Sequence, residues 1–444
     1  MNDGRDALLR LALAPADDVA APTDLGDSIF REVLATPQRR RSFLARRFTW
    51  LPAPSPLAVS VGLLVLLAAA LIIAAGARPP APPILTTYHG GPDRTGVMPG
   101  PGPVAPVRIA WSVQRPGPLL FTTMPLPVGD VVIVADGGGV VGALAQATGA
   151  VVWEHDVGSH ITGAPTLAHG NLVVVGTVDG DLVALRIADG SEMWRQDLHG
   201  GAVAAPALEA GNVLYAGTSG GTLLAVDPAT GRVERSMDVG GAVTRGPAFR
   251  DGRVYVGATG GRLTAIDVAT WSVAWTAQLG DGEVGTPTIG DGLLYVGRGL
   301  NGNGPNHDLV AIDLRDGSTA WEFASSVNAQ VHVGALANDR LFADSEDGNL
   351  TALDPKRGTR IWQTQLGGPL TTLATFADGV IYVSSQPQTV NAVAADSGAV
   401  LWQLPVGGNP TMAAVVNGRV FTGTNLGLAV AIASAGSVTA TTMP

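Results

Sequence analysis

The residues of this chain that could do chemistry are few and scattered. Seven histidines are present, at positions 89, 155, 160, 169, 199, 307 and 332, and no two of them have the spacing of a zinc-binding helix. The chain has no cysteine, which excludes disulfides and zinc–thiolate sites. It contains no Gly-x-Ser-x-Gly nucleophile elbow and no phosphate-binding loop. The sequence therefore gives no positive indication of catalysis.

One short stretch resembles two kinds of ligand site. Residues 297–302 match Gly-x-Gly-x-x-Gly, but a dinucleotide site needs a helix next, and Asn-Gly-Pro-Asn follows instead. The same stretch offers four oxygen-bearing side chains to calcium, from Asn301, Asn303, Asn306 and Asp308. Their spacing fits no known calcium loop. We interpret residues 299–308 as a surface loop.

A tryptophan repeat dominates the chain from residue 111 onward. Tryptophan recurs about every 41 residues, as Trp111, Trp153, Trp194, Trp275, Trp321, Trp362 and Trp402. From the second of these onward, alanine stands ten residues before each slot, and glycine stands four residues before it. Arg235 occupies the one slot that lacks a tryptophan, and Trp271 replaces one glycine. These fixed offsets favour a structural docking motif packed in the core over a set of rings that stack on a ligand.

Each repeat predicts one propeller blade. Apolar runs such as 171–175 predict strands, and the Thr-Gly and Asp-Gly pairs predict tight turns. Four short strands per unit are typical of a β-propeller. Seven complete units end near residue 406, and a partial eighth lacks its outer strand, which residues 108–113 supply. The sequence predicts an all-β, eight-bladed propeller over residues 107–436, with a tail at 437–444.

Four polar residues precede or open the first strands of their blades: His160, Arg245, Glu283 and His332. First strands line the axis of a propeller, so these side chains could converge at one mouth of the central channel. The alternative is that they are solvated loop residues.

Arg235 predicts a weak joint between blades. An arginine can lay its stem in a tryptophan slot, but its guanidinium stays in water. On this basis we expect Arg235→Trp to raise the melting temperature.

The Ala-x-Asp-x-x-Thr-Gly-x-x-x-Trp pattern resembles the tryptophan-docking motif of pyrroloquinoline-quinone-like (PQQ repeat) propellers, which have eight blades. The segment His89–Gly96 resembles the lead-in of that superfamily. The resemblance covers about residues 88–436. It implies one of two branches, namely quinoprotein dehydrogenases or non-catalytic BamB-like scaffolds of outer-membrane β-barrel assembly.

The chain departs from both branches. The dehydrogenases carry an adjacent cysteine pair, long insertions and a calcium site built from Glu, Asn and Asp, and none of these is found here. The assembly scaffold carries a lipidated cysteine, which is also missing. The non-catalytic branch is the better match and implies no cofactor. Pyrroloquinoline quinone and calcium belong to the dehydrogenase alternative.

An uncharged apolar stretch at 57–77 predicts a transmembrane helix, because 21 residues span about 30 Å. Five arginines within 39–47 precede it, which predicts that segment 1–56, with its short helices, is cytoplasmic. A cleaved signal peptide is the alternative, but the preceding segment is long for one. The proline-rich residues 78–106 predict a stiff tether.

Together these features predict a membrane-tethered, extracytoplasmic and non-catalytic scaffold in a bacterial plasma membrane, with an envelope protein or peptide as partner. A net charge of −10 disfavours nucleic acid as a ligand. Two alternatives remain open. One is a transmembrane sensor whose predicted helix at 24–36 holds a cytoplasmic partner, and the other is a PQQ-dependent dehydrogenase.

Overall fold

The computed structural model describes residues 85–116, 124–301, 308–324, 329–370 and 372–436. Within these ranges no helix has the length and apolar character needed to cross a membrane. The predicted transmembrane helix at 57–77, the helix at 24–36 and the tail at 437–444 lie outside the described residues.

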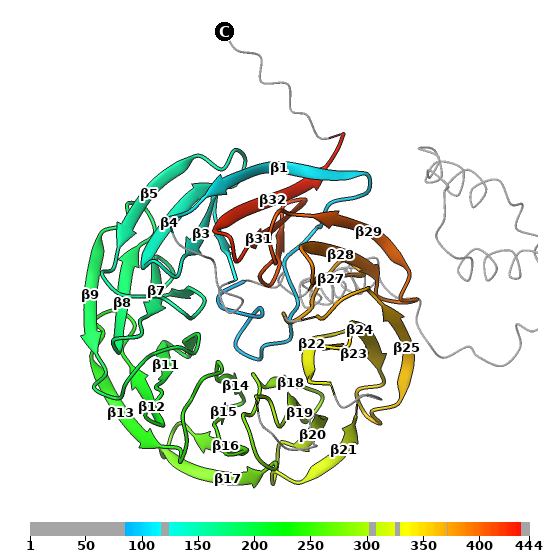
Figure 1. Cartoon of the computed structure of the whole chain (residues 1–444). Helices are drawn as coiled ribbons and strands as arrows, with labels where there is room; N and C mark the ends of the chain where they lie inside the picture. Colours follow the sequence, from blue (N-terminus) through cyan, green and yellow to red (C-terminus); the bar gives the residue numbers. More distant parts are fainter. Residues whose placement is uncertain (1–84, 117–123, 302–307, 325–328, 371, 437–444) are drawn as a thin grey trace, which may run out of the picture. The chain divides into compact units, whose positions relative to one another are not determined.

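The predicted eight-bladed all-β propeller is confirmed. In the described residues, thirty-two strands form eight four-stranded antiparallel sheets arranged in a ring (Figure 1). Blades 1 to 4 are β2 (Leu126–Val128), β3 (Val131–Ala135), β4 (Val140–Ala145) and β5 (Val151–Asp156); β6 (Thr166–Ala168), β7 (Leu172–Gly176), β8 (Asp181–Arg186) and β9 (Glu192–Asp197); β10 (Leu208–Ala210), β11 (Val213–Gly217), β12 (Thr222–Val226) and β13 (Val233–Asp238); and β14 (Ala248–Arg250), β15 (Arg253–Gly257), β16 (Arg262–Asp267) and β17 (Ser272–Gln278).

Blades 5 to 7 are β18 (Thr288–Gly290), β19 (Leu293–Gly297), β20 (Leu309–Asp313) and β21 (Thr319–Phe323); β22 (Val331–Ala337), β23 (Arg340–Ser345), β24 (Asn349–Leu353) and β25 (Arg360–Gln365); and β26 (Thr375–Ala377), β27 (Val380–Ser385), β28 (Thr389–Ala394) and β29 (Val400–Pro405). Blade 8 contains β30 (Ala414–Val416), β31 (Arg419–Gly423) and β32 (Leu428–Ser434), and β1 (Val107–Gln114) is its outer strand. The two ends of the ring are therefore joined by antiparallel pairing of β1 with β32.

The tryptophan repeat lies at the joints between blades. Each docking tryptophan stands directly opposite the repeat alanine on the neighbouring strand, as Trp153 does opposite Ala143. Its ring reaches the next blade, where the Nε1–H of Trp153 donates to the carbonyl of Ile187 at 2.7 Å. A Cβ added to Gly190 would lie 2.5 Å from a carbon of this ring, so the slot requires glycine. The small alanine and glycine make room for the indole, which explains their fixed offsets.

The sequence predicts a tether at 78–106, but from Leu85 onward the structure shows these residues inside the propeller. Residues 85–101 cross the centre of the ring and pair with the inner strands of several blades (Figure 1). Their carbonyls accept backbone hydrogen bonds from inner-strand residues Leu167, Phe249, Ile289, Leu336 and Phe376. The prolines indicated an extended chain, but this segment belongs to the propeller. We call residues 85–101 the axial plug.

Candidate binding site at the channel mouth

The axial plug distinguishes the two faces of the propeller. It pairs near the turns that join the first and second strands of each blade, and we call this side the plugged face. The open face is formed by the loops that lead into the inner strands and by the turns between the second and third strands. These loops and turns are joined by one recurring bond, such as Val178 N–H to the carbonyl of His160 and Ser219 N–H to the carbonyl of Ala202. The open face is therefore a ring of similar loops, each hydrogen-bonded to a neighbouring turn.

Arg94 holds the plug together. Its side chain is fully buried and donates to the carbonyl of Pro247 at 2.9 Å, to Thr87 Oγ1 at 3.0 Å, and to the carbonyls of Tyr88 and Ala207. Burial lowers the pKa of this guanidinium to about 9, so it stays charged at neutral pH. Its hydrogen-bond partners are carbonyl and hydroxyl oxygens, which tie three segments of chain to one point on the axis.

Three of the four predicted mouth residues come together above this plug. Arg245 Nε lies 3.3 Å from Glu283 Oε2, and both side chains are largely buried. Arg245 and His332 line a cavity of about 20 Å³ together with Tyr88 of the plug. A cavity of this size holds about one water molecule. Tyr88 is a residue that sequence reasoning missed, because nothing in the repeat links the lead-in to the mouth.

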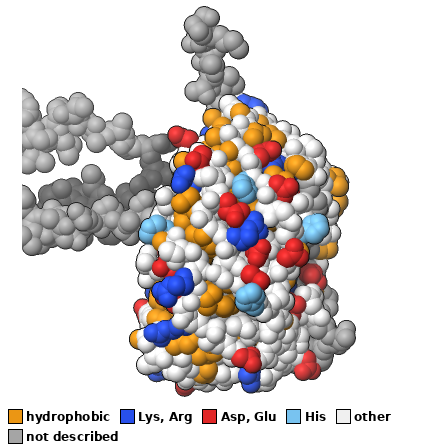
Figure 2. Space-filling model, turned by 90° about the vertical axis from the view of Figure 1, so that its left-hand side faces the viewer, with side chains coloured by type: hydrophobic (Ala, Val, Ile, Leu, Met, Phe, Trp, Pro, Cys, Tyr) orange, Lys and Arg blue, Asp and Glu red, His pale blue; other side chains and the backbone are white. Residues whose placement is uncertain are grey.

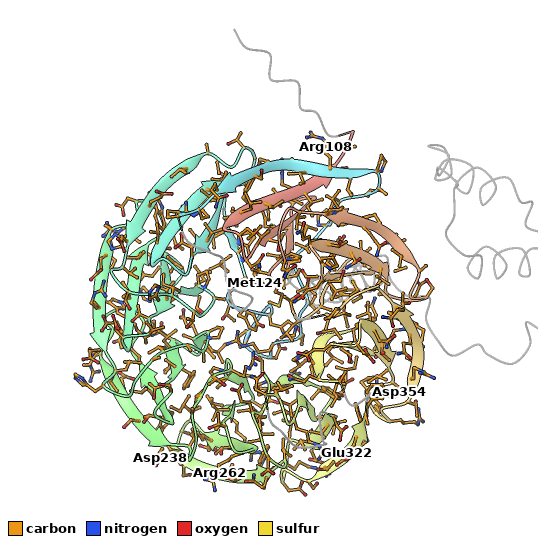
Figure 3. All side chains as sticks on the ribbon, viewed as in Figure 1. Arg108, Met124, Asp238, Arg262, Glu322 and Asp354 are labelled. Carbon is orange, nitrogen blue, oxygen red and sulfur yellow. The ribbon has the colours of Figure 1, made fainter. Side chains whose placement is uncertain are left out.

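His160, the fourth predicted residue, lies elsewhere. It is exposed, and its Nδ1 contacts the carbonyl of Gly137 in blade 1. The side chains labelled in Figure 3 lie either toward the outside of the ring or toward its axis. The charged Arg108, Asp238, Arg262, Glu322 and Asp354 lie toward the outside of the ring, whereas Met124, which is buried, lies toward the axis.

The axis carries few charges. Burial and the Arg245 cation lower the pKa of His332 to about 4, and burial and Arg94 lower that of His89 to about 4. Burial raises the pKa of Tyr88 to about 12 and raises that of Asp344 well above its usual value. At pH 7 these four groups are neutral or shifted toward the neutral form. Arg94, Arg245 and Glu283 then dominate the electrostatics of the channel.

A second buried polar cluster closes the ring and was also missed. Arg115 directly follows β1 and is buried. Its guanidinium lies 3.6 Å from Asp136, contacts the carboxylate of Glu154 and covers Gly142. The signal in the sequence is positional, because Arg115 stands four residues after Trp111, where six of the seven other repeats carry valine or leucine. The cluster fastens blade 8 to blade 1.

The described residues of the axial channel do not fit a metal or a quinone. In the described part of the chain, no group of three or more His, Asp or Glu side chains could hold a metal ion. Asp308, one of the four side chains considered for calcium, is paired with Arg298 at 2.8 Å. The axial cavity of about 20 Å³, between Tyr88 and Leu373, is far too small for a three-ring quinone.

Eight blades joined by tryptophan docking and closed by β1 define a propeller of the pyrroloquinoline-quinone-like class. The model of the family described as outer membrane protein assembly factor BamB matches residues 108–239, 221–372 and 305–442. The chain belongs to this family.

The chain is similar to BamB of Shewanella oneidensis, with 33% identity over 111 residues. That match spans 21% of this chain and 28% of the relative. Among solved structures, BamB from Moraxella catarrhalis superposes with a TM-score of 0.60 and 23% identity, over 75% of this chain and 99% of the other. The quinohemoprotein alcohol dehydrogenase of Comamonas testosteroni superposes with a TM-score of 0.64 and 14% identity, over 79% and 81%. At these identities the structural likenesses show the fold alone.

Proposed function

We propose that this protein is a non-catalytic scaffold of the bacterial cell envelope, held at the plasma membrane by residues 57–77, with the propeller on the extracytoplasmic side. The observation that carries the proposal is the match of the assembly-factor family across residues 108–442. The uncharged stretch at 57–77 supports the membrane anchor, and the arginines before it support the orientation. The partner is a protein or peptide of the envelope.

The open face is the proposed docking surface. The axial plug covers the centre of the opposite face, so a partner can reach the channel from the open face. Arg245 and Glu283 present one charge of each sign at the mouth, which suits a polar peptide segment better than a single ion. Acidic and basic side chains are also mixed on the rim over β5, β9 and β13 (Figure 2). A mixed surface of this kind suits a protein partner rather than nucleic acid.

Site-specific photo-crosslinking of the full chain in native membranes tests this proposal. A photo-reactive residue is placed at Ser219 or Asn425 on the open face, and at Asn212 or Asp251 on the plugged face as matched controls. All four positions are exposed. We expect one discrete cross-linked envelope protein from the open-face positions, and loss of that product with Arg245→Ala. Equal products from both faces, or none from either, would contradict the proposal.

The membrane anchor is tested separately. Because the chain has no cysteine, single cysteines can be introduced at Ser28 and at Asn425 and labelled in intact cells with an impermeant maleimide. We expect labelling at Asn425 and protection at Ser28, and we expect deletion of 57–77 to release the propeller from washed membranes.

A further inference from the structure

The short chain before the axial plug limits how far the propeller can stand from a membrane. Seven residues, 78–84, separate the proposed membrane span at 57–77 from Leu85, where the described propeller begins. Fully extended, this stretch reaches at most about 28 Å. The layer of polar headgroups takes up roughly 6 Å of that distance. With the proposed anchor, the point where the chain enters the propeller therefore lies within about 22 Å of the headgroups.

The chain enters the propeller on the plugged face. The carbonyl of Thr86 accepts the N–H of Leu167 in β6, and β6 runs into a turn of that face. Leu85 belongs to the apolar cluster that also contains Val128, Leu167 and Val416, which come from blades 1, 2 and 8. The entry point therefore lies on the side of the ring where these three blades meet.

This entry point decides which face is nearer to the bilayer. With the open face toward the membrane, residues 78–84 would have to reach outward to the rim and then along the height of an outer strand. An outer strand of 6 residues, such as β5, is about 20 Å high. The radius of gyration expected for about 350 residues adds roughly 20 Å. Since the sum exceeds the reach of seven residues, the proposed anchor requires the plugged face to be the nearer one.

One arc of the rim at the plugged face is apolar. Each outer strand begins at this face, because the turn before it bonds to the turn between the first two strands, as Gln146 N–H does to the carbonyl of Asp130. In blades 7, 8 and 1 the two residues before the docking tryptophan are all apolar. We call these six residues the apolar arc: Val400, Leu401, Ile109, Ala110, Val151 and Val152. Five of them, all except the alanine, are 38–53% exposed.

The arc is continuous and is confined to one side of the ring. A register shift before the tryptophan leaves Val152, between Val151 and Trp153, without a partner on β4, so two successive side chains face outward. The outer strands β29, β1 and β5 follow one another along the edge of the ring (Figure 1). Blades 2, 3, 5 and 6 instead carry a polar residue at one of the two positions, namely Glu192, Glu234, Thr319 and Arg360.

We propose that the apolar arc contacts the extracytoplasmic leaflet of the lipid bilayer, so that the propeller rests on the membrane by its plugged face, tilted toward blades 7, 8 and 1. This inference rests on the proposed function, which supplies the anchor. A lipid surface is the occupant because the entry point lies within reach of it and beside blades 8 and 1. Exposed aliphatic side chains are stabilised where headgroups meet acyl chains. A weak attraction is enough, because the anchor keeps the propeller at a high effective concentration near the bilayer.

The charges near the arc have both signs. Arg108 of β1 and Lys356 in a plugged-face turn of blade 6 are exposed, and so are Asp130 and Asp396 in the plugged-face turns of blades 1 and 7. Attraction of the cations to anionic headgroups is therefore offset by repulsion of the carboxylates. The contact should depend on apolar area and change little with the charge of the lipid.

Fluorescent labels on single cysteines test the contact, since the chain has no cysteine of its own. The full chain is placed in nanodiscs of phosphatidylethanolamine and phosphatidylglycerol, in which some lipids carry a nitroxide quencher on the headgroup. Labels at Val152 and Leu401 report on the arc. The controls are Ala274, which holds the same repeat position in blade 4, and Ser219 on the open face, and both are exposed. We expect several-fold stronger quenching at the two arc positions than at either control, and the same pattern in phosphatidylcholine.

Two changes to the chain separate the arc from its neighbours. A Gly-Ser insert of about 20 residues after Arg78 adds roughly 25 Å of reach, and the arc labels should stay quenched because the arc itself is attracted to lipid. Val151→Glu combined with Val400→Glu in this longer chain should then relieve the quenching. A chain that ends at Gly436 should keep the wild-type pattern, and loss of quenching there would assign the contact to residues 437–444.

Two results on the otherwise unchanged chain would overturn the arc. One is equal quenching at all four labelled positions, and the other is stronger quenching at Ser219 than at Val152. Loss of the arc signal on the Gly-Ser insert alone would also overturn it, because the short chain would then be the sole cause of proximity. A cross-linked partner at the open face, together with no quenching at the arc, would remove the lipid contact and leave the scaffold proposal standing.

Discussion

Most joints of this propeller are made in one direction, and the joint between blades 3 and 4 is made in the other. In the usual joint the tryptophan comes from the outer strand of one blade and rests on the glycine turn of the next, as Trp194 rests on Gly231. Between blades 3 and 4 the outer strand carries Arg235, and the turn carries Trp271 in place of glycine. The indole comes from the opposite side of the same gap.

The reversed joint restores most of the usual contacts. Trp271 reaches back into blade 3, where its ring stacks on Tyr215 with centroids 6.5 Å apart and planes 16° apart. Its Nε1–H donates to the carbonyl of Ser236 at 3.0 Å, and Arg235 reaches the carbonyl of Ala269 at 3.5 Å. The prediction of a weak joint considered Arg235 alone, whereas the structure shows that the Trp271 ring packs in the same gap. What the joint requires is one indole, and either blade can supply it.

The largest expected effect is at a usual joint. Trp194→Ala removes an almost fully buried ring together with its hydrogen bond to the carbonyl of Pro228. We expect a loss of about 3–5 kcal/mol in the free energy of unfolding, as is typical of tryptophan truncation in a core. Urea denaturation of the full chain in detergent measures it. A loss below about 1 kcal/mol would mean that the joints are not the main contacts between blades.

A smaller loss is expected at the reversed joint. Trp271 has a φ of +53°, a left-handed conformation that costs a bulky residue about 1–2 kcal/mol and costs glycine little. In Trp271→Gly this relief offsets part of the lost packing, so we expect a net loss of about 2–3 kcal/mol. If Trp271→Gly cost as much as Trp194→Ala, the strain would have no measurable energetic effect. The two variants should be compared in the same denaturation series.

A double-mutant cycle at the reversed joint tests whether the joint is equally stable when the indole comes from either blade. Arg235→Trp alone places a second indole in a filled gap, so we expect it to destabilise by about 1–3 kcal/mol through overpacking. Arg235→Trp combined with Trp271→Gly recreates the usual joint and should recover most of the stability that either single change loses. The coupling energy should be favourable and close to the sum of the two single losses, about 3–5 kcal/mol. Additive losses would show that the two directions are not equivalent.

Features that recur in each blade could be predicted from the sequence, whereas contacts that occur once could not. The eight blades, and closure of the ring by residues 108–113, follow from offsets that recur in nearly every unit. The axial plug left no such signal, because Arg94 and Pro247 are 153 positions apart and the contact is to a backbone carbonyl. The prolines there predict an extended tether, although the same extended chain can pair with inner strands. Trp271 breaks the glycine rule in the sequence, but only the geometry shows that its ring compensates for Arg235.

A last comparison is between the joints, which are mainly apolar, and the titratable axis. His332 has a folded pKa of about 4 against an unfolded value of about 6.5. Because the folded value is the lower one, stability from the neutral ring is complete above pH 6.5 and is lost as the pH falls toward 4. His332 is partly exposed, so the loss should be modest, about 1 kcal/mol between pH 7 and pH 4.5.

His332→Asn should therefore lose less stability than the wild-type chain over this range in paired thermal melts. Trp271→Gly should keep the wild-type pH dependence, because the reversed joint lies at the rim, away from the axis. If His332→Asn retained the wild-type slope, the titration would belong to another group, with the fully buried His89 as the next candidate.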